Sequence, residues 1–189
     1  MHNSVDLENQ KKDLRALQMI SSGESLPLFK YKDRAAGEFI TINLQQEMKG
    51  KKVVIFGLPG AFTPTCSTQQ LPGYDSLYPK FVAAGISDIY CTSVNDPFVM
   101  NSWFDNLNVQ NVRSLPDGNG DFATGVGALV QKRNLNFGPR SWRYALVVEG
   151  DTNTVLASFP EEGQVDNIES DPFQASTAEA VLKWVQKNL

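Results

Sequence analysis

Residues 53–66 read Val-Val-Ile-Phe-Gly-Leu-Pro-Gly-Ala-Phe-Thr-Pro-Thr-Cys, and the rest of the chain can be placed around them. The apolar run over 53–58 is rich in β-branched and aromatic residues and predicts a buried strand. Pro59-Gly60 ends this strand, and Thr-Pro-Thr is typical of a turn that enters a helix, with a threonine as its cap. Cys66 is therefore expected at a helix N-terminus, where unpaired N–H groups and the helix dipole favour a thiolate.

Length, charge and cysteine count limit which kinds of protein the chain can be. The chain has 189 residues, which predicts one globular domain with a sizeable core, and a formal charge of −4, which disfavours nucleic acid or an anionic membrane as partner. No apolar run approaches the roughly 18 residues of a membrane span. Two cysteines do not make a disulfide scaffold, so we expect a reducing compartment, the cytoplasm or an organelle.

The sequence also excludes several chemistries. His2 is the one histidine, which removes Ser-His-Asp and Cys-His catalysis and a Cys/His zinc site. Asp117-Gly-Asn-Gly-Asp121 imitates the first half of a calcium loop, but Phe122 and Ala128 stand where glycine and glutamate are needed, so a turn is predicted. No phosphate-binding or dinucleotide motif occurs. We therefore expect neither a metal nor a cofactor.

The order of patterns predicts an α/β protein. Strands alternate with helices through the middle and hairpins lie near both ends, which favours a central mixed sheet flanked by helices, with an N-terminal hairpin. We expect residues 1–18 to form an amphipathic N-terminal extension or a docking element, and residues 19–189 to form the domain. The expected elements are a hairpin over 28–42, helices at 44–49, 66–84, 98–107 and 122–130, strands at 86–94 and 109–115, a loop through 138–139, a hairpin over 143–159, a polar loop over 160–174, and a closing helix with a Ser176–Glu179 capping box.

Within these elements, two details bear on the site. Pro72 interrupts the helix after Cys66, which predicts a kinked or two-part helix. Thr63 occupies the position of the first cysteine in a C-x-x-C motif, so a dithiol is absent and a single nucleophilic sulfur remains. The alternative for Cys66 is an inert buried thiol.

The octapeptide from Pro59 to Cys66 resembles the peroxidatic-cysteine signature of the peroxiredoxins. The continuation over 67–73 is similar to the type II branch, and the blocks 93–100, 117–120 and 138–144 resemble further parts of it. The likeness extends from about Leu26 to Leu189. It implies a thioredoxin-like fold, a compact homodimer, and a peroxidase that reduces hydrogen peroxide and alkyl hydroperoxides.

Carried over residue by residue, the resemblance implies that Cys66 is the peroxidatic nucleophile. Pro59 would shield the sulfur from water, and the Thr63 hydroxyl would hydrogen-bond the peroxide and the thiolate. Arg143, at the start of a predicted strand, would be the active-site arginine, with Arg140 a weaker candidate for the same role. The five apolar residues that flank this site in sequence are expected in the core, or in part at a dimer interface: Phe62, Leu115, Leu135, Phe137 and Trp142.

Peroxide oxidises a thiolate to a sulfenic acid, which a second thiol must reduce. Cys91 is the only other cysteine, and its place in a predicted strand makes it either a core residue or a resolving cysteine. A strand cysteine and a helix-start cysteine would need local unfolding to meet. We therefore expect an external thiol to act as reductant, either glutathione with glutaredoxin or thioredoxin.

Two other functions stay open at this point. Oxidation of Cys66 could switch a redox-sensing or chaperone-like interaction protein, with residues 1–18 as a docking element. A thiol–disulfide oxidoreductase on the same fold is disfavoured by Thr63.

Overall fold

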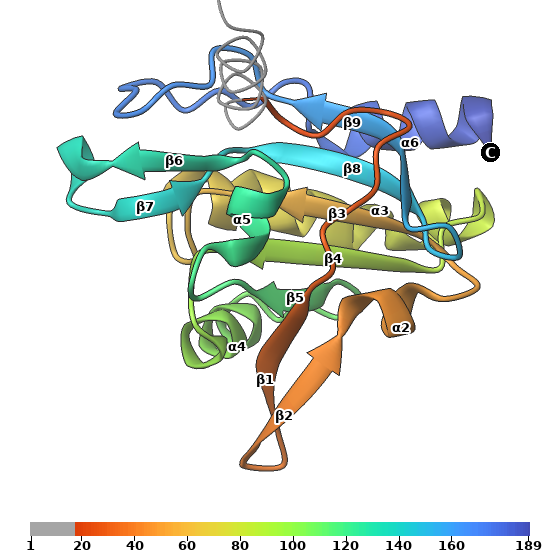
Figure 1. Cartoon of the computed structure of the whole chain (residues 1–189), viewed down its shortest axis with the longest axis horizontal. Coiled ribbons are helices and arrows are strands. Elements are labelled where there is room, and N and C mark those ends of the chain that lie inside the picture. Colours follow the sequence, from red (N-terminus) through yellow and green to blue (C-terminus); the bar gives the residue numbers. More distant parts are fainter. Residues whose placement is uncertain (1–17) are drawn as a thin grey trace, which may run out of the picture.

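A computed structural model describes residues 18–189, so the expected extension lies outside the described residues except for Gln18. A five-stranded sheet in the order β5-β4-β3-β8-β9 forms the centre (Figure 1). Its strands are β3 (Lys52–Gly57), β4 (Asp88–Ser93), β5 (Arg113–Pro116), β8 (Tyr144–Glu149) and β9 (Thr154–Pro160). β3, β4 and β5 are mutually parallel, whereas β8 and β9 run antiparallel to their neighbours, which confirms the predicted mixed sheet.

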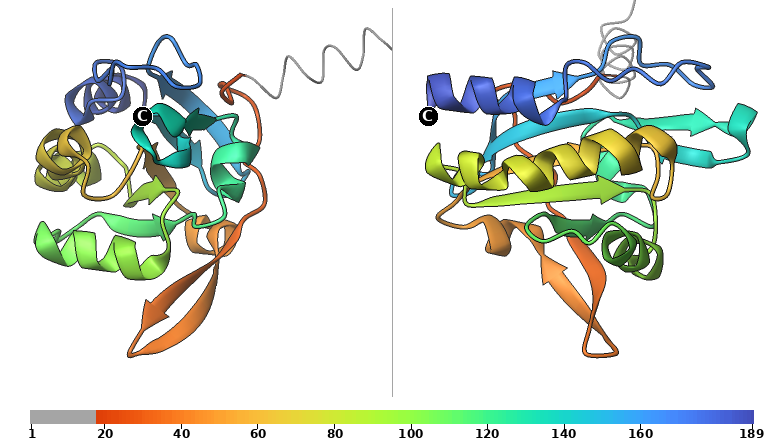
Figure 2. Two further views of the ribbon diagram at one scale, coloured as in Figure 1. Left: turned by 90° about the vertical axis from the view of Figure 1, so that its left-hand side faces the viewer. Right: turned by 180° about the vertical axis from the view of Figure 1, so that it is seen from behind.

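The strand predicted from the opening stretch is the middle of this sheet. Alternate residues of a strand point to opposite faces, and β3 is buried on both. Val54 and Phe56 pack in one core cluster with residues of α3 (Leu71–Ala83), α4 (Pro97–Asn106) and α6 (Ala178–Asn188). Val53 and Ile55 pack in the other with α2 (Leu44–Met48) and α5 (Asp121–Gly125). Figure 2 shows α3, α4 and α6 on one face of the sheet.

Side chains cap the starts of two helices, and the predicted cap of a third is wrong. The Asn43 side chain accepts from Gln46 N at the start of α2, and the Asp96 carboxylate accepts from Val99 N at the start of α4. The predicted Ser176–Glu179 capping box is wrong, because Thr177 caps α6. The hydroxyl of Ser176 instead donates to the buried carboxylate of Glu161.

Hairpins are more numerous than predicted. The first, β1 (Lys30–Ala35) with β2 (Glu38–Asn43), is where the sequence placed it. The helix expected over 122–130 is wrong in its second half, because Gly127 with φ +76 follows α5 and ends it. β6 (Leu129–Lys132) then pairs antiparallel with β7 (Gly138–Ser141) across the 3₁₀ turn Arg133–Leu135, where a loop was expected.

The strand expected over 109–115 begins only at Arg113. The backbone N–H groups of Gln110, Asn111 and Val112 donate to the carboxylate of Asp75 in α3 instead of to a neighbouring strand. A side-chain acceptor on a helix thus replaces the sheet ladder over these residues.

Candidate active site

The turn that follows β3 is held by the end of the adjacent parallel strand β4. Leu58 N donates to Thr92 O at 3.2 Å, and Ala61 N donates to the side-chain oxygen of Asn95 at 3.0 Å. The same Asn95 oxygen accepts from the Ser93 hydroxyl at 2.6 Å. Because parallel strands end at the same edge of a sheet, the end of β4 fixes the entry to the helix that carries Cys66.

Within this turn, Gly60 lies close to the guanidinium of Arg140. A Cβ at Gly60 would lie 2.7 Å from Nη1 of Arg140, which donates to Pro59 O at 3.3 Å. Pro59 itself is buried. The Thr63 hydroxyl donates to Gly60 O at 2.7 Å, so its one hydrogen does not reach the sulfur, and the expected donation to the thiolate is absent from this geometry. The lone pairs of Thr63 can still accept.

The helix begins at Pro64 and widens at Cys66 into the π-helix η1 (Cys66–Gln70), in which Leu71 N bonds to Cys66 O. Pro72 has no N–H to give to the preceding turn, and a π-turn directly before it leads into α3. The predicted two-part helix is confirmed. Cys66 is fully buried and lies in the first turn, where backbone N–H groups have no intrahelical partner.

Arg143 reaches Cys66 because of the antiparallel register of β3 and β8. Gly57 pairs with Tyr144, so Arg143 lies beside the end of β3, although it is 77 residues from Cys66 in sequence. Its Nη1 donates to Cys66 Sγ at 3.4 Å and to Oε1 of Gln70. The expectation that Arg143 approaches the sulfur agrees with this geometry.

The pKa values of the two arginines near Cys66 shift in opposite directions. Burial by itself lowers the pKa of Arg143, but the neighbouring Cys66 sulfur and the Asp171 carboxylate more than offset this and raise it. For Arg140, burial dominates and lowers the pKa, with Cys66 acting in the opposite direction. Arg143 contacts the sulfur, whereas Arg140 donates its hydrogen bonds to the carbonyls of Phe137 and Pro59.

Cys91 lies fully buried in β4, paired with Phe56 of β3 and Ser114 of β5. Burial raises the pKa of its thiol well above the usual value, and the nearby Cys66 adds to this. Both cysteines are free and belong to the same core cluster. With a hydrogen-bonded strand on each side, Cys91 is shielded from any external reductant.

The apolar residues that flank the site divide into two groups. Leu115 and Trp142 are buried in the core, as expected by default. Phe62 and Leu135 are exposed by 52% and 48%, and Phe137 is half-buried. Phe62 also has φ +62, a left-handed conformation that is strained for an aromatic residue.

Sequence reasoning missed two contacts of the arginine. Gln70 lies four residues after Cys66, on the same helix face, so its spacing was a usable signal. Asp171 binds Nη2 of Arg143 at 2.5 Å from within the polar loop, where no pattern marked it.

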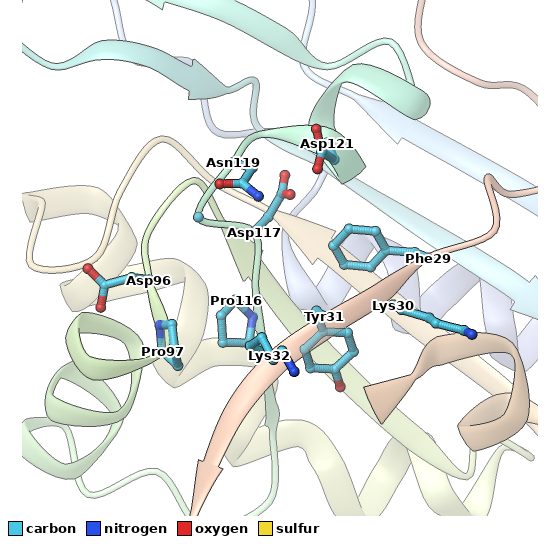
Figure 3. A pocket seen from close by; sticks show the side chains of 11 residues that line it. Phe29, Lys30, Tyr31, Lys32, Asp96, Pro97, Pro116, Asp117, Asn119 and Asp121 are labelled. Atoms are coloured by element: carbon cyan, nitrogen blue, oxygen red, sulfur yellow. The ribbon is translucent and has the colours of Figure 1, made fainter. Parts of the chain in front are cut away.

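Other features of the described chain do not compete with this site. A pocket of about 270 Å³ lies between β1 and the loop before α5, and none of Cys66, Thr63 and Arg143 lines it (Figure 3). Its Asp117 carboxylate accepts from Phe122 N and Ala123 N, which confirms the turn interpretation. Over residues 18–189 there is no cluster of three or more metal-ligating side chains and no helix long and apolar enough to cross a membrane.

The arrangement can perform one kind of chemistry well. The Cys66 sulfur lies at a helix start and accepts from a cationic donor at 3.4 Å. When the sulfur attacks a bond, the same guanidinium and the free N–H groups can stabilise the negative charge that develops on the leaving atom. This is a site for nucleophilic attack on a bond whose leaving group becomes an anion.

Comparison with known proteins gives a consistent result. Residues 21–181 match the Redoxin family. A peroxiredoxin of Sinorhizobium fredii is 55% identical over 137 residues, which cover 72% of each chain. Among solved structures, the Plasmodium falciparum antioxidant protein, a 1-Cys peroxiredoxin, has 33% identity and a TM-score of 0.84 over 89% of this chain and 100% of its own. Reduced Prx3 of Vibrio vulnificus with H2O2 has 33% identity and a TM-score of 0.79 over 89% and 97%.

Proposed function

We propose roles for individual residues of this chain, which belongs to the Redoxin family and is a type II peroxiredoxin. It is therefore a thiol-dependent peroxidase with a thioredoxin-like fold. Cys66 is the peroxidatic cysteine. The observation that carries this assignment is the Arg143 Nη1 to Cys66 Sγ contact of 3.4 Å at a helix start. Cys91, the only other cysteine, lies within a strand, and no cationic side chain of residues 18–189 donates to it.

In the proposed first step the Cys66 thiolate attacks one oxygen of the hydroperoxide. The S–O bond forms while the O–O bond breaks, so the sulfur is oxidised to a sulfenic acid and the other oxygen leaves as hydroxide or alkoxide. This oxygen then takes a proton from solvent and is released as water or alcohol. Hydrogen peroxide and small alkyl hydroperoxides are the proposed substrates.

Arg143, Thr63 and Pro59 have distinct parts in this step. Arg143 stabilises the thiolate and the charge that develops on the leaving oxygen. Thr63, whose hydrogen is held by Gly60 O, accepts the hydrogen bond of the peroxide O–H and so orients it. Pro59, buried in the turn, limits access of water to the sulfur. Arg140 holds the Pro59 carbonyl and therefore the turn.

An external thiol completes the cycle. It attacks the Cys66 sulfenic acid to give a mixed disulfide and water, and a second thiol releases the Cys66 thiolate. The burial of Cys91 inside the sheet supports an external reductant, glutathione with glutaredoxin or thioredoxin, over internal resolution. Two free thiols support a reducing compartment, and we propose the cytoplasm, with an organelle as the alternative.

We propose a homodimer as the assembly. Phe62 and Leu135 are large, exposed and close in sequence to the site blocks, so a second copy that covers them would remove apolar surface from water.

Turnover with reductant tests the function. With limiting enzyme, excess hydrogen peroxide and either the glutathione/glutaredoxin or the thioredoxin system, we expect sustained NADPH oxidation that Cys66→Ser abolishes and Cys91→Ser retains. A redox sensor switched by Cys66 would instead consume one equivalent per chain and stop. Sustained turnover by Cys66→Ser would overturn the assignment of the nucleophile.

A further inference from the structure

The segment 161–176, called the strap here, is tied at both ends by one carboxylate. Glu161 is only 4% exposed, and its Oε1 accepts from Gln174 N at 2.8 Å and from Ser176 N and Oγ, each at 2.9 Å. Its Oε2 accepts from Ala175 N at 3.1 Å. A buried carboxylate with four hydrogen bonds closes the strap into a defined loop.

The strap is also fastened to the segment that carries the arginine. Glu161 N donates to Arg143 O at 3.0 Å, and the indole N–H of Trp142 donates to Glu161 O at 2.8 Å. Further along, Asn167 N donates to Gln131 O of β6 at 2.7 Å. Figure 1 shows this part of the chain running over the β6–β7 hairpin. The strap therefore has a fixed position relative to Arg143.

Two strap residues contact the guanidinium itself. Asp171 Oδ1 accepts from Nη2 of Arg143 at 2.5 Å, and the Cζ atom of Arg143 lies 5.6 Å from the centroid of the Phe173 ring. Nη1 of the same guanidinium donates to Cys66 Sγ and to Oε1 of Gln70. Because the guanidinium is planar, a bond that fixes Nη2 also fixes the direction of Nη1.

Asp171 also supplies negative charge beside two buried cations. Arg143 and Lys132 are 2% and 4% exposed, and two buried cations near each other need a counter-ion. Burial lowers the pKa of the Lys132 ammonium, and the carboxylate of Asp171 acts against this. Asp171, with its side chain 46% exposed, is paired with the more buried Arg143 by a salt bridge.

We propose that Asp171 is a positioning residue for the peroxidase reaction: the strap holds its carboxylate on Nη2 of Arg143, so that Nη1 stays on the Cys66 sulfur. Asp171 touches no reacting atom and acts through Arg143 alone. This proposal rests on the proposed roles of Cys66 and Arg143. It requires that loss of the Asp171 acceptor slow the oxidation of Cys66 and leave the later reduction by thiol unchanged.

Two variants separate hydrogen bonding from charge. Asp171→Ala removes both the acceptor and the charge, whereas Asp171→Asn keeps a side-chain oxygen that can accept from Nη2. We expect Asp171→Ala to lower the second-order rate constant of Cys66 oxidation, measured by stopped-flow fluorescence, by about tenfold to 100-fold. Asp171→Asn recovers most of this loss. Glu169→Ala, an exposed carboxylate two residues away, is the control for charge and stays at the wild-type rate.

The opposite outcomes are equally distinct. If Asp171 only neutralised Arg143, both substitutions would raise the oxidation rate by freeing the cation for the thiolate, and that result would overturn the proposal. Equal losses in Asp171→Ala and Glu169→Ala would also overturn it, since a general field effect would then suffice. Wild-type rates in both Asp171 variants, with Cys66→Ser still inactive, would remove the positioning role and leave the proposed peroxidase function standing.

Discussion

The guanidinium of Arg143 is shared among three side chains, the Cys66 sulfur, the Gln70 amide oxygen and the Asp171 carboxylate. Such sharing needs the planar fork of arginine, with donors that point in fixed directions. A lysine would place one compact charge at the same position and could not hold the three partners in this geometry. Position 143 therefore needs the shape of arginine as well as its positive charge.

Arg143→Lys tests this directly. We expect the rate constant of Cys66 oxidation to fall by about 100-fold to 1,000-fold, the usual effect of removing one donor from a site that stabilises a developing anion. Stopped-flow oxidation with hydrogen peroxide measures it. Arg140→Lys is the matched control, because its hydrogen bonds go to two carbonyls and not to the sulfur. A larger loss in Arg140→Lys than in Arg143→Lys would assign the main role to the wrong arginine.

Asp117 gives a prediction of pH dependence. Burial raises its pKa to about 6 from an ordinary 3.8, against the lowering effect of the Ala123 and Phe122 N–H groups. A folded-state pKa above the unfolded value means that the folded protein binds more protons between these two pH values. The contribution of this group to stability is therefore present at low pH and is lost as pH rises through about 4 to 6.

Asp117→Asn removes the titration while it keeps an oxygen at the start of α5. Between pH 5 and pH 7.5 the free energy of unfolding of the wild type should fall by about 1 kcal/mol relative to that of the variant. Urea unfolding at the two pH values gives this difference. A wild type that gains stability relative to Asp117→Asn over this range would show that the backbone N–H groups outweigh burial.

At the scale of elements, the strap is the part of the site that sequence patterns could not locate. Apolar runs and the turn and cap residues beside them correctly predicted β3, α4 and the β8–β9 hairpin, because these signals lie within the residues of each element. The strap has no such repeat. Its conformation comes from one buried carboxylate that binds four groups at the far end of the loop, a tertiary arrangement that leaves no local mark.

The same reasoning explains the other differences. Ser176 and Glu179 have the spacing of a capping box, but the Ser176 hydroxyl finds a better acceptor in the buried carboxylate of Glu161. The β6–β7 hairpin was missed because its strands are only four residues each, too short to show a strand pattern in the sequence. Cys66, Thr63 and Pro59 lie in one contiguous motif and could be named. Gln70 could have been found from its spacing to Cys66, whereas Asp171 lies in a loop without a pattern and required the fold.

Glu161→Gln should loosen the strap without unfolding the domain. The amide keeps one acceptor oxygen and loses the other, and hydrogen bonds to a charged acceptor are worth about 1.5–3 kcal/mol each. We expect faster hydrogen exchange across 162–176 together with slower oxidation of Cys66, since the strap carries Asp171. Faster exchange with an unchanged oxidation rate would mean that strap order and the position of Arg143 are independent.

At the scale of the whole molecule, the sheet brings together residues that are far apart in the chain. Parallel β3 and β4 end at one edge, antiparallel β8 begins there, and the strap returns to it from β9. The reactive sulfur, its cationic donor and the turn that frames them thus meet at one edge of a rigid scaffold. This arrangement is what the predicted mixed sheet contributes to function.

Two exposed apolar residues, Phe62 and Leu135, predict the assembly. Phe62→Ser and Leu135→Ser should each shift the protein from dimer toward monomer in sedimentation velocity, because each removes apolar area from the proposed interface. Val82→Ser, a similarly exposed apolar residue on α3, serves as the control and should not change the sedimentation coefficient. A monomeric wild type, or dissociation by Val82→Ser alone, would place the contact elsewhere or remove it.

Peroxide should oxidise the sulfur of Cys66, and intact mass after one equivalent of hydrogen peroxide with dimedone present shows which sulfur reacts. We expect one dimedone adduct in the wild type and in Cys91→Ser, and none in Cys66→Ser. Loss of two hydrogens in wild-type monomers, in place of the adduct, would make Cys91 a resolving cysteine. A dimedone adduct in Cys66→Ser with none in Cys91→Ser would contradict the account.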